Sequence, residues 1–462
     1  MPLNCRLFFV VPVLAALGGC ATYQARDLTP AKTQEQLDRR QLTDAGLEQY
    51  LARHHLPAGG SWDLSRLTLA AFYFSPELAV ARAQLAEAED GVRTAAARPN
   101  PAFSFSPGRN ENSAGGVTPW ILGYALDIPV ELAGKRGYRT AEAQHHVDVA
   151  RFNLASLAWT TRSAVRRALT DLHGAEATAE LWRKQTPLLE RAAQLVEAQV
   201  TAGDASPLQA AQARIALNRA GLAIRESERT VISARSDLAA AIGVPLAALA
   251  DIRLDTAELA GSATSLATAE ARSWAAQNRA DLLAALASYA AAQSALQSEI
   301  ARQYPDLKLG PGYQFDQGES KWALSLGFEL PVFHQNQGPI AVAEARREVE
   351  STRFQALQHR VLADVDRAAA IYASSLGEVE TVATLRASLE RQTKIVRAQQ
   401  AAGETSRLDL IRAEVELADQ ARAEIDARHR NARALTDLEA AVQRPLSWPE
   451  SSWRAPAVAA RP

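Results

Sequence analysis

The spacing of hydrophobic residues changes in the same order in both halves of the chain. Stretches with helical spacing surround two short stretches in which apolar and polar residues alternate, a pattern typical of strands between helices. The first half covers residues 66–246 and the second covers 271–446. Strands are expected at about 102–107, 119–129, 306–315 and 321–331, and long helical hairpins at 133–242 and 338–442. The pattern predicts a mainly α-helical chain with two copies of strand, strand and long helical hairpin.

Direct matches between the halves, at a shift of about 200 residues, indicate an internal duplication. Trp120 to Val130 matches Trp322 to Val332. Gly203-Asp204-Ala205-Ser206 matches Gly403-Glu404-Thr405-Ser406, and Pro101, Pro107 and Gly108 match Pro305, Pro311 and Gly312. Residues 247–270 are expected to link the two copies.

One face of each predicted strand is apolar, and the other is mostly small or acidic. The apolar face is expected to contact lipid, and its members are Phe103, Phe105, Trp120, Leu122, Tyr124, Leu126, Leu307, Leu309, Trp322, Leu324, Leu326 and Phe328. Strands of about ten residues can cross a membrane at a tilt. Trp120 and Trp322 fall at the edge of the apolar band, where interfacial aromatic residues gather. A half-buried sheet in a soluble protein would explain one such strand, but four with the same pattern favour a membrane.

Four strands cannot close a membrane barrel, because such barrels need about eight or more. An open sheet edge in hydrocarbon leaves backbone groups without hydrogen bonds, at several kcal/mol each. Association is therefore a physical requirement of this interpretation. Three chains would supply twelve strands.

The helical stretches are too long for one compact core. Between Gly137 and Val200 the only proline is Pro187, and a helix of this length would extend about 100 Å. Apolar seams are expected at Leu188, Ala192 and Leu195 in the first copy and at Val361, Val365, Ala368 and Tyr372 in the second. Gly203 and Gly403 are expected to end the long helices, and Ser206 and Ser406 to begin the returning ones. The prediction is one long helical hairpin in each copy, with its end far from the barrel.

The first residues predict secretion and a lipid anchor. An apolar run from Leu7 to Leu17 follows Arg6 and is too short to span a bilayer comfortably. Leu17-Gly18-Gly19-Cys20 resembles a bacterial lipobox, which implies removal of residues 1–19 and acylation of Cys20. An ordinary signal peptide is the alternative. Residues 20–65 would then form a lipidated N-terminal extension, and 447–462 a loosely ordered tail.

Composition and side-chain chemistry argue against two other classes of protein. The net charge is −2 with no long basic run, so no nucleic-acid partner is expected. The eight histidines are scattered and show no metalloprotease spacing, and there are only two cysteines and one methionine. We therefore expect no enzyme, no catalytic residue, no cofactor and no metal site, and we expect solvated histidines.

The duplicated strand pairs and long hairpins behind a lipidated signal resemble the TolC-type outer membrane factor family over nearly the whole mature chain. The resemblance is closest to lipid-anchored members of RND-type tripartite pumps. It implies a homotrimer with a 12-stranded barrel in the outer membrane and an α-helical tunnel in the periplasm. It also implies docking on a periplasmic adaptor and an inner-membrane pump. It also implies a passive exit duct, with docking by the tip residues Gly203, Asp204, Ser206, Leu208, Gly403, Glu404, Ser406 and Leu408.

Asp409 and Arg412 are the candidate periplasmic gate. Asp409 falls where the family often has an acidic residue at the constricted entrance, and three copies would form a cation-attracting ring. Two positions depart from a double acidic ring. Gln209 occupies the equivalent place of the first copy, and Arg412 occupies the place where some relatives have a second acid. Arg412 could instead pair with an acid of a neighbouring hairpin. The alternative for Asp409 is a solvated charge near a helix N-terminus.

A periplasmic adaptor or a structural coiled-coil lipoprotein is the alternative function, because either would share the secretion signal and the alanine-rich helices. An adaptor usually has one hairpin flanked by β-rich modules, whereas here two hairpins each follow a strand pair. The sequence leaves the cargo open among drugs, metal ions and other small molecules.

Overall fold

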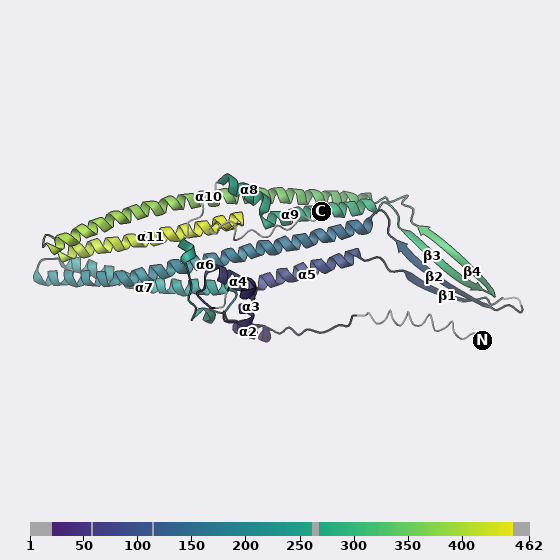
Figure 1. Cartoon of the computed structure of the whole chain (residues 1–462), viewed down its shortest axis with the longest axis horizontal. Helices are drawn as coiled ribbons and strands as arrows, with labels where there is room; N and C mark the ends of the chain where they lie inside the picture. The colour runs from purple at the N-terminus through teal and green to yellow at the C-terminus, as the bar shows by residue number, and fades with distance from the viewer. Residues whose placement is uncertain (1–20, 57–58, 113–114, 261–267, 447–462) are drawn as a thin grey trace.

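The computed structural model describes residues 21–56, 59–112, 115–260 and 268–446. The expected signal peptide, Cys20 and the tail lie outside these residues. Two pairs of long helices run along the long axis, a sheet lies at one end, and a group of short helices lies beside the middle (Figure 1).

The two longest helices, α6 (Lys135–Ala202) and α10 (Gln337–Ala401), have 68 and 65 residues. Each is followed by a returning helix, α7 (Pro207–Ile242) or α11 (Arg407–Val442). Helix α5 (Pro76–Ala96) precedes the first strand pair and α9 (Ala280–Ala301) precedes the second. The shorter helices are α2 (Pro30–Asp38), α3 (Ala45–Arg53), α4 (Leu64–Phe74) and α8 (Thr268–Asn278), with 3-10 turns at Leu246–Leu249 and Ala257–Ala260.

The long helices form a single layer four helices wide. Near the hairpin ends the order of contacts is α7, α6, α11 and α10, and near the sheet it is α5, α6, α9 and α10 (Figure 1). Helices α6 and α10 therefore run through both halves, and shorter helices complete each half. Helices of this length are stabilised by their neighbours in the layer rather than by one compact core.

The sheet contains β1 (Ala102–Arg109), β2 (Trp120–Val130), β3 (Leu307–Asp316) and β4 (Glu319–Phe328). Its order is β1-β2-β3-β4 with every pair antiparallel, so the two copies of the repeat meet between β2 and β3. Strand β4 was expected at 321–331, but it begins earlier and ends at Phe328. The reason is that β3 begins at Leu307, which lies opposite Phe328, so β3 offers no partner further on.

The main hydrophobic core lies beside the middle of the helices. The N-terminal extension contributes Leu42, Leu47 and Leu51 to it, and α7 contributes Leu238 and Ile242. The extension is therefore packed into the fold through buried leucines. It also pairs with the linker, because Trp62 and Leu254 form a parallel bridge.

The second core includes the seam expected on α10. Val361, Val365, Ala368 and Tyr372 are all buried there, which confirms that seam. On α6 the expected seam of Leu188, Ala192 and Leu195 is only half-buried. Ala193 and Val196, which lie beside these residues in the sequence, are buried instead. Helix α6 contacts both α7 and α11, so its buried stripe faces between them rather than towards one partner.

A buried ionic cluster joins the two copies of the repeat near the middle of the molecule. Arg162 and Arg166 of α6 donate to one carboxylate oxygen of Glu439 on α11, at 2.8 and 2.5 Å. The other oxygen accepts a hydrogen bond from the backbone N–H of Leu446 at 2.8 Å. Burial alone would raise the pKa of Glu439, but the positive charges of Arg166 and Arg162 outweigh it and hold this pKa below its ordinary value.

Replacing Glu439 should destabilise the protein strongly. Glu439→Gln removes the carboxylate charge that two buried guanidinium groups contact, which should lower the free energy of unfolding by about 3–5 kcal/mol. Denaturant unfolding of the detergent-solubilised protein at fixed concentration measures this. The control is Asp437→Asn, which breaks the exposed Arg167–Asp437 pair on the same helix and should cost under about 1 kcal/mol. Equal effects of the two substitutions would contradict the prediction.

The same carboxylate should make stability fall in acid. A carboxylate with a depressed folded pKa stabilises the fold above its unfolded pKa, and this stabilisation is lost as the pH falls through the folded value. Wild-type stability should therefore fall below the ordinary pKa of 4.5 more steeply than that of Glu439→Gln. Parallel slopes in pH-dependent unfolding would show that Glu439 is not the responsible group.

Candidate functional site

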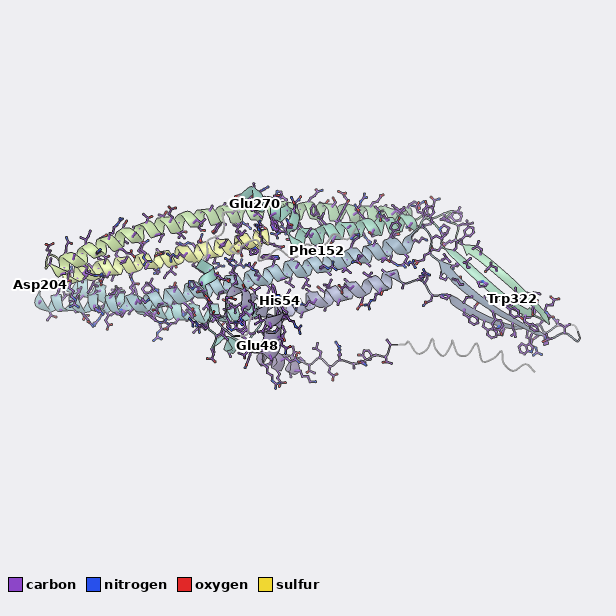
Figure 2. All side chains as sticks on the ribbon, viewed as in Figure 1. Glu48, His54, Phe152, Asp204, Glu270 and Trp322 are labelled. Atoms are coloured by element: carbon purple, nitrogen blue, oxygen red, sulfur yellow. The ribbon has the colours of Figure 1, made fainter. Side chains whose placement is uncertain are left out.

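The two hairpin turns lie together at the end of the molecule opposite the sheet. Figure 2 shows Asp204 at one extreme and Trp322 near the other. Gly203 and Gly403 have φ values of 87° and 79°, in the left-handed region that glycine adopts without strain. Both are exposed, as are Asp204 and Glu404.

Each returning helix begins with a serine cap. The Ser206 hydroxyl accepts a hydrogen bond from the N–H of Gln209, whose side chain accepts one from the N–H of Ser206. The Ser406 hydroxyl likewise accepts a hydrogen bond from the N–H of Asp409, at 3.1 Å, at the start of α11. Both serines remain exposed at the tip.

The two tip leucines differ. Leu208 is 66% exposed, whereas Leu408 is 8% exposed and lies buried together with Ile411. Of the expected docking residues, Leu408 is therefore not available on the surface of a single chain. This asymmetry between matched positions was not evident from the sequence, where both are leucines two residues after a capping serine.

Asp409 is exposed but locally engaged. The hydroxyl of Ser406 donates to its carboxylate at 2.6 Å, and that of Thr405 donates at 3.3 Å. Arg412 lies one turn on, with its Nη1 3.5 Å from Oδ1. The hydrogen bond from Ser406 is the main cause that lowers the pKa of Asp409, and the charge of Arg412 adds to it. The structure thus pairs the two candidate gate residues within one chain and keeps Asp409 ionised.

The sheet presents a continuous apolar surface on one face. The register places Phe103 opposite Leu126, Phe105 opposite Tyr124, and Leu309 opposite Leu326, and directly opposed residues share a face. By the same register and the alternation of side chains, all twelve residues expected to contact lipid lie on this face. Trp322 is 82% exposed, Leu324 76% and Phe103 67%. That this face meets lipid stays a prediction.

A row of aromatic side chains crosses the sheet on the apolar face. Phe105, Tyr124, Tyr313 and Trp322 are successive cross-strand neighbours, with ring centroids 5.0, 6.2 and 4.8 Å apart. Such pairs stabilise a sheet by more than their buried area alone. The opposite face carries small and polar residues such as Gly123, Ala125 and Ser325, so the two faces suit different solvents.

A groove of about 550 Å³ follows α6 between α7 and α11. At its wall His429 lies with Nε2 2.8 Å from Oδ1 of Asp171, and Arg433 reaches the same oxygen at 3.5 Å. The expectation that all histidines are solvated was therefore wrong for His429, which is only 29% exposed and packs against Gly174. The pairing joins α6 to α11, and no local sequence pattern indicates a contact between residues so far apart.

The described part of the chain holds no group of three or more His, Cys, Asp or Glu residues arranged to bind a metal ion. Within the same residues, no helix has an apolar stretch long enough to cross a bilayer.

The comparison with known families decides between the candidate classes. Residues 71–244 and 257–442 match the model of the outer membrane efflux protein family, which is well over half of the chain. The chain belongs to this family. Membership confirms the resemblance to outer membrane factors and the expectation of an outer-membrane efflux component. The adaptor and the structural lipoprotein lose their support.

One curated relative is similar in sequence over much of the chain. The cobalt-zinc-cadmium resistance protein CzcC of Cupriavidus metallidurans is 27% identical over 288 residues, which cover 62% of this chain and 66% of CzcC. The match thus spans slightly less than two thirds of that relative.

Two solved structures share the fold. The outer membrane protein VceC of Vibrio cholerae is 20% identical, with a TM-score of 0.67 over 83% of this chain and 96% of its own. The open MtrE outer membrane channel of Neisseria gonorrhoeae is 18% identical, with a TM-score of 0.65 over 83% of this chain and 89% of its own. These likenesses confirm the fold class of long helices with a small sheet.

The serine caps should hold the tips of this efflux protein in place. Ser406→Ala removes the acceptor for the N–H of Asp409, which should cost about 1 kcal/mol and lower amide protection in the first turn of α11 about fivefold. Hydrogen exchange followed by mass spectrometry measures this, and Ser406→Thr is the control that keeps a hydroxyl. Unchanged protection in Ser406→Ala would show that the cap does not stabilise the tip.

Proposed function

We propose that three copies of this chain form a passive exit duct, with a 12-stranded barrel in the outer membrane and a helical tunnel in the periplasm. One observation carries the proposal: the sheet has an exposed apolar face, and within the described residues its outer strands β1 and β4 each pair on one side only. In hydrocarbon such edges must be paired, since each unsatisfied backbone group costs several kcal/mol.

The proposed number of three copies rests on the interior space that a duct needs. Two copies would close about eight strands, and side chains fill a barrel of that size. Three copies give twelve strands and a wider interior. The face that would line it carries Gly123, Ala125, Gly312 and Ala323, which leave room for water and solutes.

The helix layer supports the same assembly, because it is also open at both sides. On α7, Ile215 and Leu222 are seven residues apart and 49% and 71% exposed. On α10, at the other side of the layer, Ile371 and Leu385 are fourteen residues apart and 53% and 50% exposed. Apolar residues at such spacing form seams between parallel or antiparallel helices. Contact between α7 of one copy and α10 of the next would close the tunnel.

The remaining parts of the proposal concern anchoring and partners. Acylation of Cys20 would tie each copy to the outer membrane. The exposed tip residues, with Leu208 as the apolar contact, would dock on a periplasmic adaptor that connects the duct to an inner-membrane pump. The duct would perform no chemistry, and the pump would supply the energy. The relative CzcC is a cobalt-zinc-cadmium resistance protein, which supports divalent metal ions as one cargo class beside drugs and other small molecules.

Assembly and conductance test this function directly. The purified acylated protein should have the mass of a trimer in detergent, measured by native mass spectrometry, and should conduct ions in planar bilayers. The mature chain without its acyl group should still require detergent. A water-soluble, non-conducting monomer would overturn the proposal.

Removing Arg412 should increase the cation preference of the duct. Arg412 lies beside Asp409 and offsets its charge, so Arg412→Ala should leave three carboxylates around the axis and raise the cation-to-anion permeability ratio by at least about twofold. Reversal potentials in a salt gradient measure this ratio. Lys394→Ala, which removes one exposed positive charge from α10 away from the turn, is the control. A similar change in both variants would remove Asp409 and Arg412 from the gate.

A further inference from the structure

A second groove, here called the α4–α6 groove, lies between the N-terminal extension and α6. Its volume is about 690 Å³, and its walls include Leu56 of the extension, Leu69 and Phe72 of α4, and Trp159 of α6. His54, which also lines it, lies beside the middle of the long helices (Figure 2). Leu56 and Leu69 pack against the main hydrophobic core, so the groove continues that core to the surface. Water avoids such apolar surface, so an apolar group that covers it is favoured.

One buried polar group in the α4–α6 groove lacks a hydrogen-bond partner. Thr68 of α4 lines the groove and is 7% exposed, and its hydroxyl makes no hydrogen bond within the described residues. A buried hydroxyl in this state costs free energy, which a donor placed in the groove would recover. The best occupant therefore combines an apolar body with one hydrogen-bond donor.

The end of the described chain lies at this groove. Pro445 lines it, three residues past the end of α11, and Leu446 is 5% exposed. Residues 447–462 follow and lie outside the described residues. Trp448 is three residues from Pro445, so its backbone lies at most about 11 Å away. Its indole has a large apolar body and a single N–H donor, which matches the groove.

The first copy of the repeat shows how the corresponding segment folds there. Pro245 matches Pro445 in the internal duplication. The chain after Pro245 forms the 3-10 turn Leu246–Leu249, and Leu249 is 6% exposed within the main hydrophobic core. Directly after the matched proline, the first copy therefore turns back and buries an apolar side chain.

We propose that the segment after Leu446 turns into the α4–α6 groove, with the side chain of Trp448 as its occupant. The ring lies against Phe72 and Trp159, and the indole N–H donates to the hydroxyl of Thr68. The segment then joins the N-terminal extension to the end of α11, and it holds the first residues of the tail, which the sequence predicts to be loosely ordered. The contact forms within one chain and does not depend on the proposed trimer.

Oxidative footprinting of the full-length acylated protein in detergent, followed by mass spectrometry, tests the contact without any substitution. Trp453 is the internal reference, because it is the same residue type in the same tail. Trp448 should be oxidised at least about fivefold more slowly than Trp453, since a docked side chain reacts only when the segment opens. Equal oxidation of the two tryptophans would overturn the proposal.

A substitution that fills the groove shows where the tail docks. Ala155→Trp places a large side chain in the α4–α6 groove and should raise the oxidation of Trp448 to that of Trp453. Asn153→Trp, at an exposed position of α6 that does not line the groove, is the matched control and should leave Trp448 protected. Protection of Trp448 that persists in Ala155→Trp would place the tail elsewhere and overturn the proposal.

Removing the occupant should expose the groove. Trp448→Ala should increase the oxidation of Trp159 about threefold, whereas Trp453→Ala should leave it unchanged. Native mass spectrometry first confirms that each variant keeps the assembly state of the wild type, so that a folding defect is not mistaken for an emptied groove. If Trp159 stays shielded in Trp448→Ala, a second copy or a small apolar molecule covers the groove instead, which would also overturn the proposal.

Discussion

The structure depends on one constraint, the need to satisfy the backbone groups of a four-stranded sheet whose one face is apolar. A sheet with such a face and two open edges is stable neither in water, which the face avoids, nor alone in hydrocarbon, where the edges lack hydrogen bonds. Phe103, Leu324 and Trp322 are exposed on this face, and β1 and β4 each have one side that no described strand pairs. The proposed association of copies would meet both needs at once. It would also bring the helix layers of neighbouring copies together, because each hairpin continues from a strand pair.

The internal duplication gives both halves of the chain the same order of elements. Matched residues that differ in charge or exposure distinguish the two halves. At the tips, Gln209 and Asp409 take the same capping position with different charge, and Leu208 and Leu408 differ in exposure. The first hairpin therefore presents an apolar contact that the second lacks, and the second presents an additional charge, so a partner at the tip would meet two distinct surfaces in each copy.

Ion pairs between α6 and α11 hold the two repeats together. Arg162 and Arg166 meet Glu439 in the buried middle, and His429 meets Asp171 nearer the tips. A buried ion pair contributes little net stability over an apolar one, but it requires its partners to be in place. These contacts therefore favour one alignment of α6 against α11. Charged side chains here serve the alignment of the helices.

The sequence by itself determined the elements, the duplication, the capped hairpin ends and the apolar face, because hydrophobic period and turn residues report local conformation. It placed the α10 seam of Val361, Val365, Ala368 and Tyr372 correctly. Only the tertiary structure decided where β4 ends, which tip leucine is buried, and that Arg166 pairs with Glu439 across 273 residues. These features depend on which segments lie side by side in the fold. The buried residues of α6 differ from the expected seam for the same reason, because α6 packs against both α7 and α11. A period of 2 or 3.6 residues identifies the buried face of an element but not its neighbour.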